Sequence, residues 1–233
     1  MASTSLTSGN SCSCQPKKTK ENVKLLVGVT ASVATIKLAE LCSALYALPF
    51  VQEIAVVPTE KSEKFFKSEE VISAGSSHKK KEVKIWRDSD EWAMWNGRGD
   101  PVLHIDLGKW ADAMIIAPLD ANTMAKVSVG MCDNLLTCVL RAWELKEIKT
   151  KPVFICPAMN TKMWDHPKTQ EHIETLKSYG YTYIAPMAKT LMCGDTGIGA
   201  MASVDTIVST FQGYVEDTCI CTVKACSNET GKK

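Results

Sequence analysis

The chain has 233 residues, of which 45% are hydrophobic and 23% are charged, and 27 Lys and Arg residues nearly balance 26 Asp and Glu residues. This length and composition exclude a chain that is disordered throughout, and the neutral charge gives no support to a nucleic-acid binder. No apolar run approaches the roughly 18 to 20 residues of a membrane span and residues 1–20 contain no signal-peptide core, so we expect a cytoplasmic protein without a membrane partner.

The first third of the chain predicts a polar tail followed by two strand–helix units. Residues 1–22 contain no hydrophobic periodicity and are predicted to be disordered. The apolar run Val23–Val29 predicts a strand buried on both faces, followed by the small-residue turn Thr30–Ser32 and a helix through Leu45. A second strand, Glu53–Pro58, leads into Thr59 and a helix that carries Phe65 and Phe66. Residues 73–84 are polar and like-charged, and we interpret them as a surface insertion.

The rest of the chain continues the alternation. The predicted strands here are apolar throughout and end at small or polar residues: 113–117, 153–156 and 182–185. The predicted helices show apolar periodicity behind a polar start: 90–95, a helix opened by Ala121–Thr123, one capped by Asp133 and running to Trp143, about 166–179 with Gly180 as terminator, and 203–215. Residues 216–233 are predicted to be a loose C-terminal tail.

This alternation predicts one α/β domain over residues 23–215, a doubly wound, Rossmann-like (flavodoxin-like) parallel sheet with helices on both faces. Ten cysteines are present, five of them in the two tails and the others in apolar or glycine-rich segments. We therefore expect reduced thiols and no disulfide framework. The pairs Cys12/Cys14 and Cys219/Cys221 lack the spacing of a zinc site, so no metal site is predicted.

Ligands of such a sheet bind beyond the carboxyl ends of the strands, so the residues after each strand are the candidates for a site. The small residues in Gly28–Lys37 are consistent either with a tight turn alone or with a turn that binds a phosphate. The segment lacks the second and third glycines of the dinucleotide fingerprint. The turn Asp120–Thr123 favours helix capping over ligand binding. Asn160 and Met163 follow the fourth strand. A lone Met such as Met163 is more often a core residue than a ligand contact.

Two further candidates lie elsewhere along the chain. Residues 191–201 place three glycines around Cys193, which predicts a mobile flap or an unusual backbone path. Most cysteines in a reducing compartment are nevertheless small apolar core residues. His104 stands between two apolar residues, where a hydrogen-bonded core histidine is more common than a catalytic base.

Five segments together resemble one family, the homo-oligomeric flavin-containing cysteine decarboxylases. They are VGVTASVATIK (27–37), DPVLHIDLGKWAD (100–112), APLDANTMAKVSVGMCDNLLTCVLRAW (117–143), PAMNTKMWDHP (157–167) and MCGDTGIGAMA (192–202). The resemblance spans about residues 23–215, and its most specific parts are the PAMN segment and the Cys-Gly-Asp flap. Ala31 stands where the family commonly has Gly, so the backbone there must avoid positive φ.

The resemblance implies FMN as cofactor, a small-molecule substrate and a homotrimer with flavin at the subunit interface. It implies the decarboxylation of 4′-phospho-N-pantothenoyl-L-cysteine to 4′-phosphopantetheine in coenzyme A biosynthesis. The residues that it assigns to FMN are Ser32, Val33, Thr59, Phe65, Asp120, Ala121, Asn122 and Thr123. His104 would be the base, Asn160 would contact the substrate carboxylate, Met163 would clamp the substrate, and Cys193 would donate a proton.

These residue types suit that reaction, in which the flavin oxidises the thiol-bearing carbon to a thioaldehyde, CO2 leaves, a proton is added and hydride returns. An imidazole can accept the thiol proton at pH 7, and a neutral amide orients a carboxylate without stabilising its charge. Two alternatives remain, a non-catalytic regulatory subunit of a protein phosphatase and a peptidyl-cysteine decarboxylase. The presence of His104, Asn160 and Cys193 favours catalysis over regulation.

Overall fold

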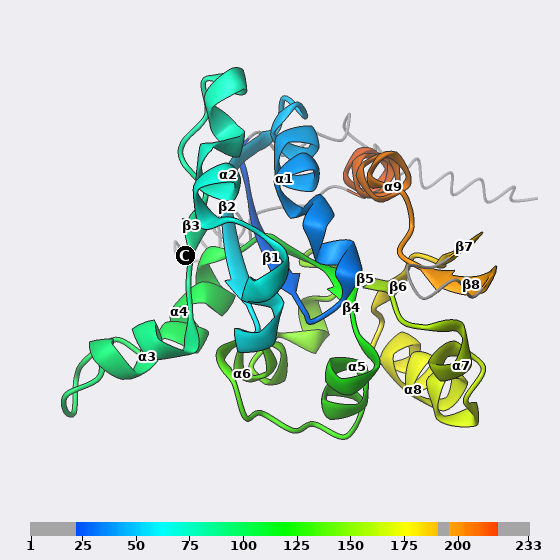
Figure 1. Cartoon of the computed structure of the whole chain (residues 1–233). Coiled ribbons are helices and arrows are strands. Elements are labelled where there is room, and N and C mark those ends of the chain that lie inside the picture. Colours follow the sequence, from blue (N-terminus) through cyan, green and yellow to red (C-terminus); the bar gives the residue numbers. More distant parts are fainter. Residues whose placement is uncertain (1–21, 191–195, 219–233) are drawn as a thin grey trace, which may run out of the picture.

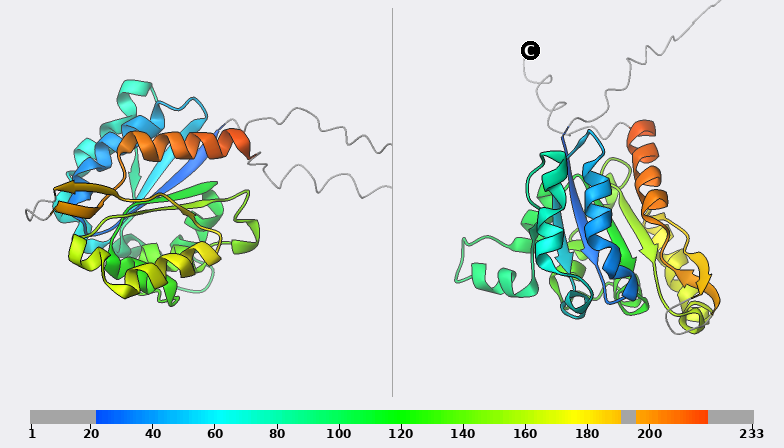
Figure 2. Two further views of the ribbon diagram at one scale, coloured as in Figure 1. Left: turned by 90° about the vertical axis from the view of Figure 1, so that its right-hand side faces the viewer. Right: turned by 45° about the horizontal axis from the view of Figure 1, so that its top comes forward.

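The computed structural model describes residues 22–190 and 196–218 of the chain. A six-stranded parallel sheet lies between two layers of helices, and a separate antiparallel pair of strands lies beside it (Figures 1 and 2). This arrangement confirms the predicted doubly wound, Rossmann-like α/β fold. None of the helices in the described ranges has both the length and the hydrophobicity that crossing a bilayer requires.

The central strands form where the sequence has continuous apolar runs, because both faces of each are covered by helices. The strands are β1 (Val23–Val29), β2 (Val51–Pro58), β3 (Lys84–Ile85), β4 (Ala113–Leu119), β5 (Val153–Pro157), β6 (Thr182–Tyr183), β7 (Met187–Thr190) and β8 (Thr196–Ala200). All five predicted strands are present, although β6 ends at Tyr183 rather than at residue 185.

The helices connect the strands and cover both faces of the sheet. The α-helices are α1 (Leu38–Tyr46), α2 (Ser68–Ile72), α3 (Asp88–Met94), α4 (Leu103–Trp110), α5 (Ala121–Ser128), α6 (Leu135–Arg141), α7 (Thr161–Trp164), α8 (Pro167–Ser178) and α9 (Val204–Asp217). The 3₁₀ helices are η1 (Val33–Lys37), η2 (Glu60–Phe65), η3 (Ser73–His78) and η4 (Leu145–Glu147). The predicted terminator of α8, Gly180, has a φ of +85°, a left-handed conformation that glycine adopts without steric cost.

The strand order β3-β2-β1-β4-β5-β6 fixes where a ligand can bind. It is the Rossmann order, and without the two-residue edge strand β3 it would be the flavodoxin-like order. In both descriptions the order in which the chain adds strands reverses between β1 and β4, so the turns that follow these two parallel strands flank the expected ligand site.

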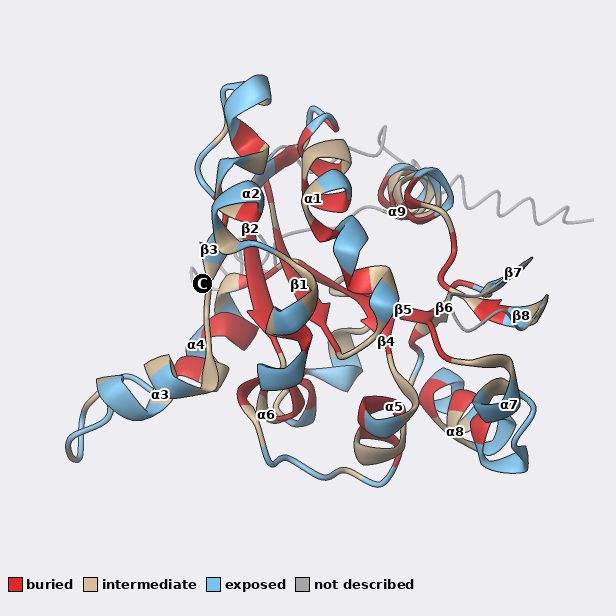
Figure 3. Ribbon diagram, viewed as in Figure 1, coloured by how far each residue is buried: buried red, intermediate tan, exposed pale blue. Residues whose placement is uncertain are grey.

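Alternate residues of the central strands feed two separate cores, one on each face of the sheet. Val27, Ile115 and Phe154 pack toward α1 and α9, whereas Leu26, Ile116 and Ile155 pack toward the layer of α4, α5, α6 and α8. Phe211 of α9 meets Phe154 edge-on, with ring centroids 5.5 Å apart. Figure 3 shows the consequence, a buried sheet with helices that are exposed on their outer sides.

Residues 73–84 are not the pure surface insertion that their charge suggested. Gly75 and Val83 are buried, and Val83 belongs to the core cluster beneath α1. His78 Nε2 lies 3.2 Å from the Ser43 hydroxyl of α1, and β3 adds the segment to the edge of the sheet through β2. The prediction was wrong because it considered the overall polarity of the segment. Two buried residues, Gly75 and Val83, are enough to anchor the segment against the core.

Three local predictions also need correction. Asn134, not Asp133, caps α6, because its Oδ1 accepts a hydrogen bond from the Thr137 backbone N–H at 2.9 Å, while Asp133 pairs with Lys126. The helix after Thr59 is a 3₁₀ helix, and Phe66 leaves it in an extended conformation. At the C-terminal end, α9 continues past residue 215 to Asp217.

Candidate active site

The turns after β1 and β4 are joined by one buried hydroxyl. Thr30 Oγ1 donates to the Pro118 carbonyl at 2.9 Å and accepts from the Asp120 backbone N–H at 2.7 Å, and Thr30 is fully buried. Two polar groups of the second turn are thereby satisfied by the first turn. Thr30 therefore holds both sides of the crevice together, a role that its place in a small-residue turn does not reveal.

Ser32 and Val33 begin the 3₁₀ helix at this crevice. The Ser32 hydroxyl caps η1 by accepting a hydrogen bond from the Ala34 N–H at 3.4 Å. Val33 is 42% exposed and Ile36 of the same helix is 60% exposed, so two apolar side chains stand in the open beside the turn. The positive-φ non-glycine residues of the described chain are Asn22 and Lys79, so Ala31 avoids positive φ as expected.

Thr59 and Phe65 approach the same edge from β2. The Thr59 N–H donates to the Val29 carbonyl at 2.8 Å, which sets Thr59 beside the end of β1. Phe65 is half-buried and lines a shallow depression of about 320 Å³ together with Ile36, Phe66 and Val71. Thr30 and Asp120 are not among the residues that line this depression, so we place the candidate site at the turns and not in the depression.

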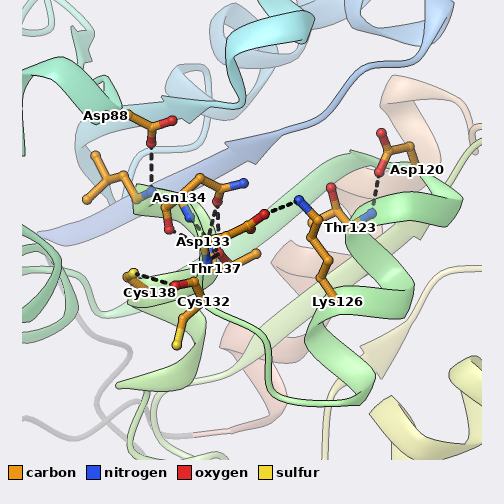
Figure 4. Close-up of polar contacts among 10 residues, drawn as sticks. Asp88, Asp120, Thr123, Lys126, Cys132, Asp133, Asn134, Thr137 and Cys138 are labelled. Carbon is orange, nitrogen blue, oxygen red and sulfur yellow. Dashed lines mark hydrogen bonds and ion pairs between the residues drawn. The ribbon is translucent and has the colours of Figure 1, made fainter.

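The turn Asp120–Thr123 serves mainly as a helix cap, as its sequence favoured. Asp120 Oδ1 accepts a hydrogen bond from the Thr123 N–H at 2.7 Å (Figure 4). Thr123 is buried, whereas Asn122 is exposed and Ala121 is half-buried. A ligand in the crevice would thus meet Asn122 and the first turn of α5 more readily than Thr123.

Asn160 lies next to this turn, across the β4–β5 pair. The Ala158 N–H donates to the Leu119 carbonyl at 3.0 Å, so the segment after β5 runs beside the segment after β4. Asn160 caps α7 by accepting from the Lys162 N–H at 2.8 Å. Met163 on α7 is 50% exposed, which excludes the core role that a lone Met suggests and leaves its thioether available to a ligand.

The described part of the glycine-rich segment contains β8, which pairs with β7 and packs against the Asn160 loop. Gly199 accepts a hydrogen bond from the Met159 N–H at 2.9 Å and has a φ of +146°, and a Cβ there would lie 2.3 Å from the Met159 carbonyl oxygen. Only glycine permits this close approach of two backbones. Cys193, the predicted proton donor, lies outside the described residues.

His104 lies in the first turn of α4, where its Nδ1 contacts Glu91 Oε1 of α3. The Cys138 sulfur completes a group of three possible ligand atoms within 4.8 Å of one another. Neither Glu91 nor Cys138 was singled out as a site residue from the sequence. Glu91 lies 13 residues before His104 on another helix, and no motif joins either residue to His104.

The structure does not bring His104 and Asn160 together in one chain. On their side of the sheet the contacts run from α4 to α6, from α6 to α5 and from α5 to α8, so two helices separate His104 from the far end of the layer. Figure 1 shows α4 near one edge of the sheet and α7 near the opposite edge. The predicted site is therefore divided into a flavin-type crevice with Asn160 and Met163, and a distant His104.

The described cysteines are free thiols, as predicted: Cys42, Cys132, Cys138 and Cys156. Burial raises the pKa of the Cys42 thiol to about 12, and the pKa of the buried Cys156 thiol is raised further by the same cause. Both thiols therefore remain protonated and serve as small core residues.

Comparison with known proteins identifies the family of the chain. The sequence model of the Flavoprotein family matches residues 13–216. A curated relative from Mus musculus, phosphopantothenoylcysteine decarboxylase, is 48% identical over 204 residues, which cover 88% of this chain and 93% of the relative. A phosphopantothenoylcysteine decarboxylase from Arabidopsis thaliana is 43% identical and covers 85% of this chain and 88% of its own length.

Two solved structures are similar to the whole domain. A cysteine-to-serine mutant of a PPC decarboxylase, complexed with pantothenoylaminoethenethiol, superposes with a TM-score of 0.76 at 42% identity and covers 84% of this chain and 100% of its own. The FMN binding protein AtHal3 superposes with a TM-score of 0.74 at 42% identity and covers 85% of this chain and 99% of its own.

Proposed function

The chain belongs to the Flavoprotein family, and on that basis we propose that it is an FMN-dependent decarboxylase of 4′-phospho-N-pantothenoyl-L-cysteine that forms 4′-phosphopantetheine for coenzyme A biosynthesis. The observation that carries the proposal is that Thr30 joins the turns after β1 and β4, which bring Ser32 and Asn122 to the edge of the sheet where Asn160 also lies. Relatives that span nearly the same length and are named for this reaction support the choice of substrate.

The crevice suits the two halves of FMN. Backbone N–H groups at the start of η1 can bind a phosphate, while exposed Val33 and half-buried Phe65 can cover a flat ring. Because the Asp120 carboxylate already occupies the start of α5, the phosphate is better accommodated near Ser32 and Thr59. Bound FMN would supply a two-electron acceptor that takes hydride from the thiol-bearing carbon and returns it after CO2 has left.

His104 is the proposed base. The substrate is a cysteine amide whose thiol has an ordinary pKa near 8.5, so at pH 7 a nearby proton acceptor is needed to form the thiolate. The imidazole of His104 is 27% exposed and can reach a ligand, whereas Glu91 behind it is only 13% exposed. His104 would hold the thiol proton while the carboxylate departs.

Asn160 and Met163 are the proposed substrate contacts. An amide can donate a hydrogen bond to the substrate carboxylate and fix its direction, yet it adds no positive charge that would favour the carboxylate over CO2. The exposed thioether of Met163 can cover the apolar part of the substrate. Both side chains lie on the short α7 segment that β8 holds in place.

Cys193 is the proposed proton donor to the carbon that loses CO2. The described strands that flank it, β7 and β8, are paired, and β8 contacts the Met159–Thr161 segment. A donor between these two strands would be tethered to the Asn160 side of the site. Exclusion of water by the paired strands β7 and β8 would protect the reactive intermediate.

The separation of His104 from Asn160 supports a homotrimer in which each site is shared between two copies. Within one chain the helix layer keeps α4 and α7 apart, so a base from one copy and an amide from its neighbour can complete one site. The exposed apolar side chains Val33 and Ile36 would then be covered by the partner or the ring. The cytoplasmic location stays a prediction.

The visible absorption spectrum of the purified protein tests the cofactor and the chemistry together. We expect the absorption bands of oxidised flavin in the wild-type protein. Anaerobic addition of the phosphorylated substrate should bleach these bands, and mass spectrometry should identify 4′-phosphopantetheine as the product. A peptide with a C-terminal cysteine is the matched control and should give no product. Correctly assembled protein that neither carries nor takes up FMN would refute the proposal. Protein that binds a phosphatase but has no decarboxylase activity would favour the regulatory alternative.

A further inference from the structure

Glu91 and His104 form a contact between two helices that the proposed reaction does not yet use. Glu91 Oε1 faces His104 Nδ1, and the pair lies where α3 crosses the first turn of α4. The imidazole is the more exposed partner, at 27% against 13% for the carboxylate. The carboxylate therefore stands behind the ring as seen from solvent, on the side opposite to an incoming ligand.

The start of α3 is fixed on two sides, which sets the position of Glu91. Arg87 Nε donates to Glu63 Oε2 at 2.8 Å, and Arg87 also donates to the Ser68 hydroxyl at 3.1 Å. Asp88 Oδ1 accepts from the Leu135 N–H at 2.7 Å and so ties α3 to the start of α6 (Figure 4). Glu91 lies three residues after Asp88 and hence on the same face of the helix.

We propose that Glu91 is the positioning residue for His104. The Glu91 carboxylate accepts a hydrogen bond from the Nδ1–H group of His104. Nε2 is thereby left unprotonated and directed away from Glu91, where it can act as the proton acceptor. A neutral imidazole has one donor and one acceptor nitrogen, and a carboxylate can only accept, so this contact selects one of the two tautomers. The inference rests on the proposed function, in which His104 is the base. Glu91 also supplies the negative charge beside the imidazolium that forms when Nε2 takes a proton.

Cys138 is the third group of this cluster and does not alter the assignment. Its thiol points to the Cys132 carbonyl at 3.7 Å (Figure 4), and burial, reinforced by Glu91, raises its pKa to about 11. Cys138 therefore stays neutral at pH 7. Asp88 and Asp133 add negative charge near Cys138, and Asp88 is engaged with the backbone of α6.

Nitrogen-15 NMR of the histidine rings tests the tautomer without any need for turnover. The chain has only four histidines, and the His104→Asn variant identifies the His104 signals in long-range ¹H–¹⁵N spectra. We expect the Nδ1–H tautomer in the wild type at alkaline pH and a shift toward the Nε2–H tautomer in Glu91→Ala. Asp106→Ala removes an exposed carboxylate of the same first turn of α4 and should leave the tautomer unchanged.

Kinetics form the second readout. Glu91→Ala is expected to lower kcat about 100-fold with little change in KM, within the roughly 10²–10⁴-fold that a positioned base contributes. Glu91→Gln keeps the volume but not the charge, and we expect a loss of kcat of at least about tenfold. An Nε2–H tautomer in the wild type, or wild-type kcat in Glu91→Gln, would overturn the inference. A protein with the expected tautomer but no decarboxylase activity would instead refute the proposed function.

Discussion

The two ends of the helix layer hold their functional residues by different means. At the α7 end, Asn160 is positioned by contacts between backbones, the Met159–Gly199 hydrogen bond and the close approach of β8. At the α4 end, His104 is positioned by side chains, through Glu91 and the anchors Arg87 and Asp88. The proposed contact for the substrate carboxylate is thus set in a rigid backbone frame, and the proposed proton acceptor is set among carboxylates.

This difference has a chemical basis. An amide that must only orient a substrate needs a fixed position and no charge nearby, which a backbone frame provides. A base must stabilise a proton once it has accepted it, and a carboxylate that contacts its other nitrogen does so. We therefore expect substitutions at the α7 end to change the stability and geometry of the protein, and the effects of substitutions at the α4 end to depend on pH.

Mixing two inactive variants tests whether the two ends meet across copies, and it has the largest expected effect. His104→Asn and Asn160→Ala should each be nearly inactive alone. Trimers that contain both variants, purified through two different tags, should recover about a third of the sites, because one interface in three then pairs an intact His104 with an intact Asn160. The measurement is product formed per subunit.

Two controls accompany this mixture. Trimers that carry one variant under both tags should stay inactive, and wild-type chains under both tags should keep full activity. Mixed trimers that remain inactive although they are assembled and contain FMN would show that His104 and Asn160 act in the same chain.

Gly199→Ala probes the backbone frame at the α7 end. A Cβ at this position meets the Met159 carbonyl oxygen at 2.3 Å, and the φ of +146° strains any residue with a side chain. We expect the free energy of unfolding to fall by about 3 kcal/mol in urea titrations. Gly213→Ala in α9 is the matched control, since a Cβ there meets nothing within 4 Å, and it should gain roughly 0.5–1 kcal/mol. Equal stability of the two variants would contradict the packing of β8.

Asp88→Asn probes the α4 end, with the smallest effect. Burial raises the pKa of Asp88 in the folded protein, so the folded state binds this proton more tightly than the unfolded state. The stability that the group contributes is present below its unfolded pKa and is lost as the pH rises through the folded value. Because Asp88 is partly exposed, the Asn variant should gain less than about 1 kcal/mol over wild type between pH 4 and 7. Urea titrations across that range measure it, and a relative loss by the variant would contradict the assignment.

Part of the candidate site was accessible from residue patterns. The turn Asp120–Thr123 was favoured as a cap, and the Asp120–Thr123 hydrogen bond confirms that interpretation. The unusual backbone path that the glycines of residues 191–201 predict is present at Gly199, whose φ is +146°. The roles of Thr30 and Glu91 were not accessible, because Thr30 bonds residues 88 and 90 positions away and Glu91 acts on a residue of another helix.

The sequence by itself determined the central strands, most of the helices and the parallel class of the sheet, because burial on both faces and helix capping are encoded in neighbouring residues. It did not determine which turns meet or how far apart two functional residues stand. The tertiary structure decided that Thr30 joins the turns of β1 and β4, and that α4 and α7 lie at opposite ends of one layer. Such contacts depend on the order in which strands and helices pack, and that order arises from the sum of many weak interactions distant in sequence.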